Sequence, residues 1–463
     1  MTVSTAQSLN KRIILGLIVA AAVLTATRFG GFIEEEEQRP PVILISLDTL
    51  RADHAGFMGY PRETTPFLDE LARESMVFDQ AYSTMSWTLI AHMSLLTGLY
   101  PEQHKVWKPD SVLPESAETL AERLKGLGYH NMGFYFPGWL DPDYGFGRDF
   151  DVYMPHDNLK QAGANIRKAM AKRPKDKPYF LFIHLFDIHN KPVKREPSLL
   201  YQSPAPYDEM FMAGANKLLE DTISFQVWHM GSHNLSLDQH DAVVAQYDGG
   251  IRYVDDELRA WSEEWREAGT FDDAVVIVTS DHGEGLAQRR KRYAGHGDTF
   301  EEGLRVPLLF RFPDGLNANT RVKEMVNHVD VVPTLLDYLG VPSDERCVGY
   351  SLLDGRPSDS MMVAGGNKME VIYQWPYKLV RKRELGTDSG HVTNLDEDPM
   401  EANPLRAAQD EERFLELAGE LRTRLKERGE GWYWPEADEV PAEDPLDEEQ
   451  LRALEALGYT GDE

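Results

Sequence analysis

The sequence is poor in cysteine. It contains one, Cys347, among 463 residues. A single thiol cannot build an internal disulfide framework, and it cannot supply the several thiolates of a cysteine-rich metal site. Stability must therefore come from the apolar core, for which a hydrophobic content of 42% is ample. Any metal site must use oxygen and nitrogen ligands.

Positive charge is scarce as well. The chain has 48 Lys and Arg residues against 77 Asp and Glu residues, which gives a formal net charge of −29. Such a surface repels a phosphate backbone, so nucleic acid is excluded as a partner. Most of these charges are expected to solvate the surface.

Long apolar runs are few, and the one at the N-terminus is informative. Residues 13–27 are uncharged and mostly apolar, and they follow Lys11 and Arg12. This pattern is typical of a secretory signal peptide and is shorter than the ~20 residues of a membrane span. Because no clear cleavage site follows, a retained N-terminal membrane anchor is the alternative. We expect an exported protein, extracytoplasmic or periplasmic, whose residues 1–33 are the signal or anchor and whose residues 34–40 are an acidic linker.

Three apolar runs predict strands that are buried on both faces and therefore parallel. Helical patterns lie between them, and this alternation predicts a doubly wound α/β sheet. The strands are expected at 41–48, 178–187 and 274–281, and the helices at 117–128 and 241–269.

Each of these three strands ends in an aspartate: Asp48, Asp187 and Asp281. The carboxyl ends of parallel strands meet at one edge of a sheet, and ligands bind beyond that edge. The three carboxylates are therefore expected to converge on a functional site.

The rest of the chain fits one large domain with additions. A further strand is expected at 305–315 and a helix at 328–340, while a proline-rich stretch interrupts the alternation. The predicted organisation is a catalytic domain at 41–355 with an insertion near the site at 190–240, a C-terminal α+β subdomain at 356–430 with antiparallel strands, and an acidic tail at 431–463.

The segment "SWTLIAHMSLLTG" predicts a short helix that begins near Thr88. A helix start offers free backbone N–H groups and the positive end of the helix dipole, which stabilise an alkoxide and a bound oxyanion. His92 lies four residues further on and so shares the face of Thr88. Isolated threonines at helix starts are usually N-caps, so the assignment of a chemical role depends on the neighbours of Thr88.

The neighbours expected at the sheet edge are Asp48, Asp281 and His282. Two carboxylates, an imidazole and the Thr88 hydroxyl form a ligand set for one divalent cation. Such a cation lowers the cost of forming the threonine alkoxide and neutralises an oxygen of a tetrahedral anionic substrate. Imidazole favours Mn²⁺, Zn²⁺ or Mg²⁺ over Ca²⁺.

Several blocks of the sequence resemble, in order, those of the sulfatase-like branch of the alkaline phosphatase superfamily. They include "LISLDTLRADHAGFMGY", "SLLTGLYP", "YDGGIRYVDDEL", "VTSDHGE" and "GHGDTFEEGLRVPLL". The likeness runs from about residue 41 to residue 405. It implies an alkaline phosphatase-like fold of three α/β/α layers, with a mostly parallel central sheet and a smaller C-terminal subdomain. It also implies an ester hydrolase in which a nucleophile beside a metal attacks phosphorus or sulfur.

The chain departs from the sulfatase pattern at the positions that carry chemistry. Sulfatases have a cysteine or serine, matured to formylglycine, where this chain has Thr88, and threonine cannot make that conversion. Thr49 stands at the second position of the family's Asp-Asp pair, His282 replaces the asparagine of its Asp-Asn pair, and His296 takes the place of a lysine.

These departures resemble the members that process phosphoesters and phosphonates with a threonine nucleophile. A threonine phosphate is resolved by water, whereas a threonine sulfate requires a second attack at sulfur. We therefore favour hydrolysis of phosphate or phosphonate esters with one divalent metal ion and no formylglycine. The alternatives are a sulfatase that works without formylglycine, a transferase of the phosphoglycerol or phosphoethanolamine type, and an inactive anion-binding protein.

The resemblance also suggests residues that contact the substrate, a small anionic ester that is free or linked to a lipid or glycan. His189 corresponds to a family histidine that touches the anion or protonates the leaving group. His296 is expected to bind substrate or assist catalysis, with a second metal site shared with Asp187 as the alternative. His92 and Lys378 are further candidates for substrate binding. The basic run 288–293 is a candidate for attracting the anion.

Overall fold

The computed structural model describes residues 39–189, 201, 203–220, 235–289, 294–342, 347–357, 361–366, 369–382 and 390–406. The predicted N-terminal segment 1–33, the acidic tail 431–463 and most of the predicted insertion at 190–240 lie outside these residues. The chain divides into two compact units, Met1–Arg39 and Pro40–Glu463, and both main sheets belong to the second. Among the described residues, no helix is both long and apolar enough to cross a membrane.

A nine-stranded, mostly parallel sheet forms the centre of the second unit. Its strand order is β11-β2-β10-β6-β1-β5-β3-β4, with β9 paired to β2. The strands are β1 (Val42–Leu47), β2 (Met76–Tyr82), β3 (His130–Tyr135), β4 (Val152–Pro155), β5 (Tyr179–Leu185), β6 (Val275–Thr279), β9 (Arg305–Val306), β10 (Leu308–Arg311) and β11 (Thr320–Asn327).

The three predicted buried strands are neighbours in this sheet. β1 pairs in parallel with β5 on one side and with β6 on the other. Every residue of the three strands is buried, as their continuous apolar runs predict. The pairing Ser46↔His184 and Ser46↔Thr279 brings the ends of the three strands to one level. The predicted α/β fold class is confirmed, and Asp48 and Asp281 follow strands that end side by side.

The strand predicted at 305–315 is wrong in its extent. Two short strands, β9 and β10, replace it, and Pro307 lies between them. Proline has no backbone N–H to donate, so it interrupts a ladder at this point. β9 pairs with β2, while β10 runs antiparallel between β2 and β6.

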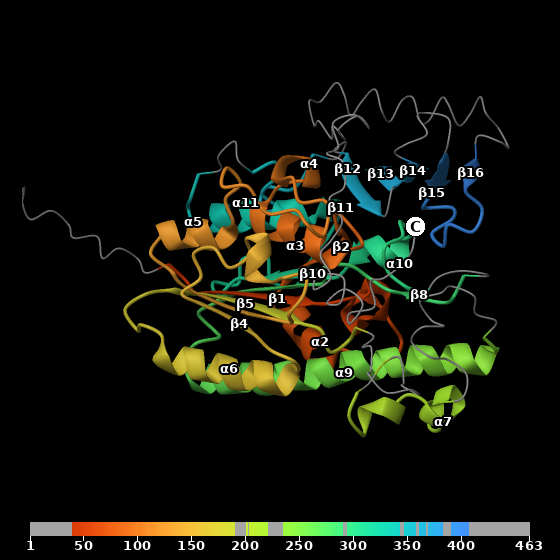
Figure 1. Ribbon diagram of the computed structural model, residues 1–463, viewed down its shortest axis with the longest axis horizontal. Helices are drawn as coiled ribbons and strands as arrows, with labels where there is room; N and C mark the ends of the chain where they lie inside the picture. Colours follow the sequence, from red (N-terminus) through yellow and green to blue (C-terminus); the bar gives the residue numbers. More distant parts are fainter. Residues whose placement is uncertain are drawn as a thin grey trace, which may run out of the picture. The chain divides into compact units, whose positions relative to one another are not determined.

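Helices cover both faces of the sheet (Figure 1). One cluster of buried apolar side chains packs one face of β1 and β5 against the helices drawn below the sheet. A second cluster packs the opposite face of the sheet against the helices drawn above it. Below lie α2 (Pro66–Arg73), α6 (Leu159–Lys172), α7 (Ala215–Glu220) and α9 (Leu237–Glu267); above lie α3 (Thr88–Thr97), α4 (Pro101–His104), α5 (Leu120–Gly126) and α11 (Val331–Tyr338). Short 3-10 helices are η1 (Ala52–His54), η2 (Gly56–Met58), η3 (Pro142–Tyr144), η4 (Tyr207–Glu209) and η5 (His328–Asp330).

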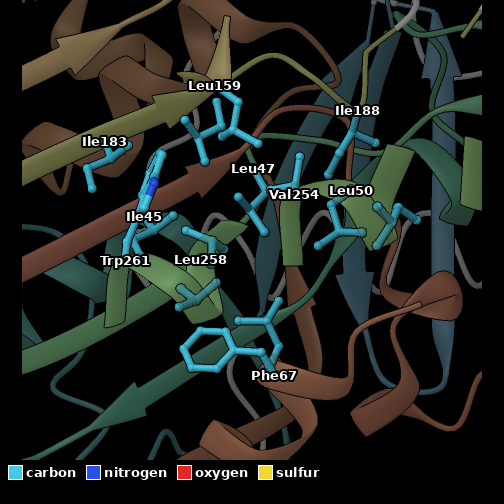
Figure 2. Close-up of a cluster of buried hydrophobic side chains, with 14 of the residues drawn as sticks. Ile45, Leu47, Leu50, Phe67, Leu159, Ile183, Ile188, Val254, Leu258 and Trp261 are labelled. Atoms are coloured by element: carbon cyan, nitrogen blue, oxygen red, sulfur yellow. The ribbon is translucent and has the colours of Figure 1, made fainter. Parts of the chain in front are cut away.

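The long helix α9 fixes the lower layer. It begins at Leu237, four residues before the predicted start, because Ser236 caps it and accepts a hydrogen bond from the backbone of Gln239. Figure 2 shows Val254 and Leu258 of α9 in the same apolar cluster as Leu47 of β1. Burial of this face anchors the helix beneath the end of β1.

The predicted antiparallel C-terminal sheet is confirmed. Five antiparallel strands, β12 (Met362–Gly366), β13 (Met369–Gln374), β14 (Tyr377–Lys382), β15 (Gly390–Asn394) and β16 (Leu405–Arg406), follow one another in order. Between β6 and β9 in sequence lie the short pair β7 (Gly285–Leu286) and β8 (Ala294–Gly295) and the one-turn helix α10 (Glu301–Leu304). The predicted domain boundaries stay predictions.

One buried histidine supports the upper layer. His104 ends α4 and is fully buried, and its Nδ1 accepts a hydrogen bond from the Val106 N–H at 3.1 Å. The proton is therefore on Nε2, which donates to the Ser94 hydroxyl at 3.2 Å. Burial lowers the pKa of His104 to about 3. The neutral ring ties α4 to α3.

This depressed pKa predicts a pH-dependent contribution to stability. Unfolded His104 takes up a proton below its usual pKa of about 6.5, whereas the folded residue stays neutral down to about pH 3. The stability contributed by the neutral ring is therefore lost as pH falls from about 6.5 to 3, by up to about 1.4 kcal/mol per pH unit. Chemical denaturation of wild type and His104→Gln at pH 7 and 4.5 should show the stability advantage of the wild type shrinking at low pH. A difference that does not change with pH would contradict the assignment.

Candidate active site

Helix α3 places Thr88 at the carboxyl edge of the sheet. The helix begins at Thr88 after the extended residue Trp87 and ends at Gly98, whose φ of 71° is left-handed. Thr88 does not act as an N-cap; its Oγ1 lies 3.2 Å from Nε2 of His282. The hydroxyl therefore points to the predicted metal ligands and away from the helix backbone.

Those ligands are brought together as predicted. One ligand atom from each of Asp48, Asp281 and His282 lies within 4.8 Å of the other two, and all three residues are buried. Oδ1 of Asp48 and Oδ2 of Asp281 receive no hydrogen bond from the described residues. Burial, followed by the charge of Asp281, raises the pKa of Asp48 well above its usual value. Two buried carboxylates with undonated oxygens are the environment that a bound cation compensates.

The tautomer of His282 suits metal binding. Its Nδ1 lies 2.9 Å from the carbonyl oxygen of Gly283, which can only accept, so Nδ1 carries the proton. The lone pair is therefore on Nε2, the atom that faces Thr88. A backbone partner that fixes the ring in this way is typical of histidine metal ligands. The residues fit a cation held by two carboxylates, one imidazole and one hydroxyl.

A second group of possible ligands, His92, His184 and Asp281, also lies within 4.8 Å. The Phe136 N–H donates to Nδ1 of His184 at 3.3 Å, so Nε2 carries the proton and donates to Oδ2 of Asp48 at 2.8 Å. Both ring nitrogens of His184 are thus used within the protein. It orients Asp48 and does not compete for the cation.

His92 is held in the same way. Its Nδ1–H donates to the Thr88 carbonyl at 2.9 Å, and its Nε2 accepts from the Ser46 hydroxyl at 2.9 Å. Burial lowers the pKa of His92 to about 3 and that of His184 to about 4. His92 is fully buried, so its contacts favour a role in supporting Thr88. Its contact with substrate stays a prediction.

Two predicted substrate-binding histidines lie beside the metal ligands. The His296 ring centroid is 4.5 Å from that of His282 and 5.0 Å from that of His189. His189 stacks on Phe186 with centroids 4.0 Å apart. Burial lowers the pKa of His296 to about 4, so it presents a neutral imidazole at the position where sulfatases carry a charged lysine.

The short β7–β8 ladder explains how His296 reaches the site. Gly285 pairs with Gly295, which makes Glu284 and His296 neighbours across the ladder. The Glu284 carboxylate lies 3.3 Å from Nδ1 of His296 and accepts a hydrogen bond from the Tyr201 hydroxyl at 3.1 Å. Glu284 is a site residue that the sequence analysis did not identify.

The Lys378 side chain is paired with two glutamates. It is fully buried, and its Nζ lies 3.0 Å from Glu301 and 2.8 Å from Glu401. Glu301 also accepts from the hydroxyls of Tyr82 and Tyr373. These contacts join the C-terminal sheet to α10. They give Lys378 a structural role, and its contact with substrate stays a prediction.

Part of the basic run is also paired within the protein. Arg289 forms a bidentate ion pair with Glu302 and stacks over Phe300, with its guanidinium 3.8 Å from the ring centroid. Residues 290–293 lie outside the described residues. The proposed attraction of an anion by this run stays a prediction.

The missed supporting residues had a weak signal in the sequence. Ser46 and His184 are polar residues within otherwise apolar strands, and they are register partners in β1 and β5. A polar side chain buried in a strand needs a polar partner, but the partner depends on strand order. That order was not predicted.

Comparison with known proteins agrees with this geometry. The sequence profile of the Sulfatase family matches residues 40–341. The chain belongs to the sulfatase family. It therefore lies within the ester-hydrolysing sulfatase branch of the alkaline phosphatase superfamily, and the resemblance inferred from the sequence is confirmed.

Individual relatives are distant. The chain is 26% identical over 364 residues to the Extracellular sulfatase SULF-1 homolog of Drosophila melanogaster, covering 68% of this chain and 31% of that protein. It is 26% identical over 411 residues to the Multifunctional alkaline phosphatase superfamily protein PehA of Trinickia caryophylli, covering 69% and 78%. The chain thus spans less than a third of the length of the fruit-fly relative.

Solved structures share the fold. The phosphonate monoester hydrolase of Agrobacterium radiobacter has a TM-score of 0.66 at 20% identity, covering 85% of this chain and 96% of that chain. The phosphonate monoester hydrolase SpPMH of Silicibacter pomeroyi has a TM-score of 0.64 at 18% identity, covering 85% and 96%. At these identities the likeness establishes the fold alone.

The ligand set predicts metal-dependent stabilisation. After treatment with a chelator, Mn²⁺ at about 100 times its Kd should stabilise the protein by about 2.7 kcal/mol, because the ion binds the folded state. Differential scanning calorimetry measures this as a rise in Tm. Asp281→Asn should lose most of the rise, while Asp79→Asn, which removes a surface carboxylate paired with Arg321, should keep it. An equal rise in all three proteins would place the ion elsewhere.

Proposed function

We propose that the protein is a metal-dependent hydrolase of phosphate or phosphonate esters in which Thr88 is the nucleophile. The observation that carries this proposal is the position of Thr88 Oγ1, at the first residue of α3 and 3.2 Å from Nε2 of His282. Beside it lie the two carboxylates of Asp48 and Asp281. A threonine with a purely structural role would not need two buried carboxylates and a histidine beside its hydroxyl.

The residues divide into binding, reacting and supporting groups. Asp48, Asp281, His282 and Thr88 would hold one divalent cation, and the donor set favours Mn²⁺, Zn²⁺ or Mg²⁺. When bound, such an ion acts as a Lewis acid toward the Thr88 oxygen and a substrate oxygen. The free N–H groups at the start of α3 stabilise negative charge at the same point.

The reaction would proceed in two displacements at phosphorus. The Thr88 oxygen loses its proton and forms a bond to phosphorus, and the bond from phosphorus to the ester oxygen of the leaving alkoxide or aryloxide breaks. His189 gives the leaving group a proton, which balances the proton that Thr88 lost, while the neutral ring of His296 is proposed to bind the substrate. Water then attacks phosphorus, the bond to Thr88 breaks, and phosphate or phosphonate and the free hydroxyl are regenerated with no net redox change.

The identity of the nucleophile favours phosphorus over sulfur. A formylglycine hydrate releases sulfate by collapsing to its aldehyde, whereas the threonine hydroxyl has no such route. Hydrolysis of a sulfate ester without formylglycine is nevertheless the second candidate, because named relatives include an extracellular sulfatase, ulvan-active sulfatases and N-sulphoglucosamine sulphohydrolase. Transfer to an acceptor alcohol and anion binding without turnover are further outcomes of the test.

The substrate is proposed to be a small anionic ester, free or attached to a glycan or lipid. Structural neighbours include a protein solved in complex with its substrate D-glucosamine-2-N,6-O-disulfate, which is consistent with a glycan-linked ester. An extracytoplasmic location follows from the predicted export signal at residues 1–33, and a retained anchor there would hold the enzyme at a membrane.

An assay panel tests the proposal. Aryl phosphate mono- and diesters, a phosphonate monoester and an aryl sulfate are each supplied with Mn²⁺, Zn²⁺, Mg²⁺ or Ca²⁺. We expect turnover of a phosphorus ester and loss of kcat by at least about 10⁴-fold in Thr88→Ala. Thr97→Ala, which removes a buried hydroxyl at the other end of α3, should retain activity.

The covalent step has its own readout. Mass spectrometry of the acid-quenched enzyme should find a phosphoryl group on Thr88 during turnover, and none on Thr88→Ala. Exclusive hydrolysis of the aryl sulfate would favour the sulfatase alternative. Full turnover by Thr88→Ala would refute the proposed nucleophile.

A further inference from the structure

The turn that follows β1 contains a backbone conformation that threonine rarely adopts. Thr49 has φ of 58°, in the left-handed region. For a β-branched residue this is a genuine outlier, because its Cβ crowds the backbone. Such conformations persist only where the surroundings hold them, and they concentrate at functional sites.

Thr49 is hydrogen-bonded to the Asp281 carboxylate and to the backbone of Asp48. Its backbone N–H donates to Oδ1 of Asp281 at 3.1 Å, and its hydroxyl donates to the carbonyl of Asp48 at 2.8 Å. The first of these bonds requires the left-handed turn to aim the N–H across to the neighbouring strand end. The conformation of Thr49 therefore sets how Asp48 and Asp281 lie relative to each other.

Tyr247 of α9 is the side chain that holds this turn. Its hydroxyl donates to the carbonyl of Thr49 at 2.6 Å and accepts from the N–H of Arg51 at 2.9 Å. The ring is fully buried, and burial raises the pKa of the phenol well above its usual value, so the hydroxyl keeps its proton. One oxygen thus satisfies two buried backbone groups on either side of Leu50.

The apolar packing of α9 makes this contact rigid. Leu47 and Leu50 flank the turn and lie in the same buried cluster as Val254, two turns beyond Tyr247 on α9 (Figure 2). The helix is therefore fixed against β1 independently of the tyrosine hydroxyl. Loss of that hydroxyl leaves the helix in place and frees the turn to relax.

We propose that Tyr247 is a positioning residue for the cation site: it holds Thr49 in the left-handed conformation that places the Asp48 and Asp281 carboxylates for one ion. This inference rests on the proposed metal site. Tyr247 acts through the hydrogen bonds that its hydroxyl makes with the backbone of Thr49 and Arg51.

Isothermal titration of the chelator-treated protein with Mn²⁺ alone tests the proposal. Tyr247→Phe should weaken Mn²⁺ binding by about 10- to 100-fold, the usual effect of losing a residue that orients ligands. Tyr129→Phe is the matched control, because that buried hydroxyl donates to the Pro40 carbonyl at 2.7 Å, just before the opposite end of β1. Its Mn²⁺ affinity should equal that of the wild type.

The strained residue provides a second, independent arm. Glycine adopts a positive φ without penalty, so Thr49→Gly lowers the tendency of the turn to relax. Tyr247→Phe should therefore cost several-fold less Mn²⁺ affinity in the Thr49→Gly background than in the wild-type background. A residue that merely packed in the core would cost the same in both. If the single variant Tyr247→Phe does not fold, the double variant Thr49→Gly/Tyr247→Phe is tested in its place. The proposal then requires that this double variant folds and binds Mn²⁺.

The possible results distinguish failure of the proposed cation site from failure of the positioning role of Tyr247. If the wild type binds no Mn²⁺, the proposed cation site falls and this inference falls with it. If the wild type binds and Tyr247→Phe binds equally well, the positioning role alone is refuted. Equal losses in Tyr247→Phe and Tyr129→Phe would also refute it, because the effect would then be a general loss of stability.

Discussion

Two buried carboxylates, those of Asp48 and Asp281, face each other at the carboxyl edge of the sheet, and one oxygen of each receives no hydrogen bond from the described part of the chain. Repulsion between them and the loss of hydration would make this pair unfavourable unless a proton or a cation lay between them. The surrounding residues are arranged for this constraint. His184 and the Thr49 N–H each bind one carboxylate oxygen, which leaves the other oxygen of each carboxylate for the proposed cation.

The fold produces this pair through strand order. β1 and β6 are adjacent and parallel, so the aspartates that follow them emerge at one edge, and β5 on the far side of β1 contributes His184. Helix α3 then brings Thr88 to the same edge. His92 links helix and strand, since one ring nitrogen binds the Thr88 carbonyl and the other binds Ser46 in β1. The proposed nucleophile is thereby held in register with the carboxylates.

Much of this arrangement could be predicted from local pattern. Continuous apolar runs ending in aspartate indicated parallel strands and a common edge, and the helix start at Thr88 could be placed from the sequence, whereas a chemical role for its hydroxyl rested on the family resemblance. The supporting residues could not be predicted, because their roles depend on contacts between segments distant in sequence. Glu284 and His296 meet through a two-residue ladder, and Tyr247 reaches Thr49 across 198 positions. Lys378 shows the opposite case: its segment matched the family, yet its ammonium group is paired with two glutamates, Glu301 and Glu401.

The central claim is that one cation is shared by the two carboxylates, His282 and the Thr88 hydroxyl. Anomalous X-ray diffraction from crystals grown with Mn²⁺ tests it most directly, because the signal locates the ion without reference to activity. We expect one strong peak between Asp48 and Asp281, coordinated by Nε2 of His282 and Oγ1 of Thr88. A peak bound by His92 and His184, or a peak whose coordination excludes Thr88, would contradict it.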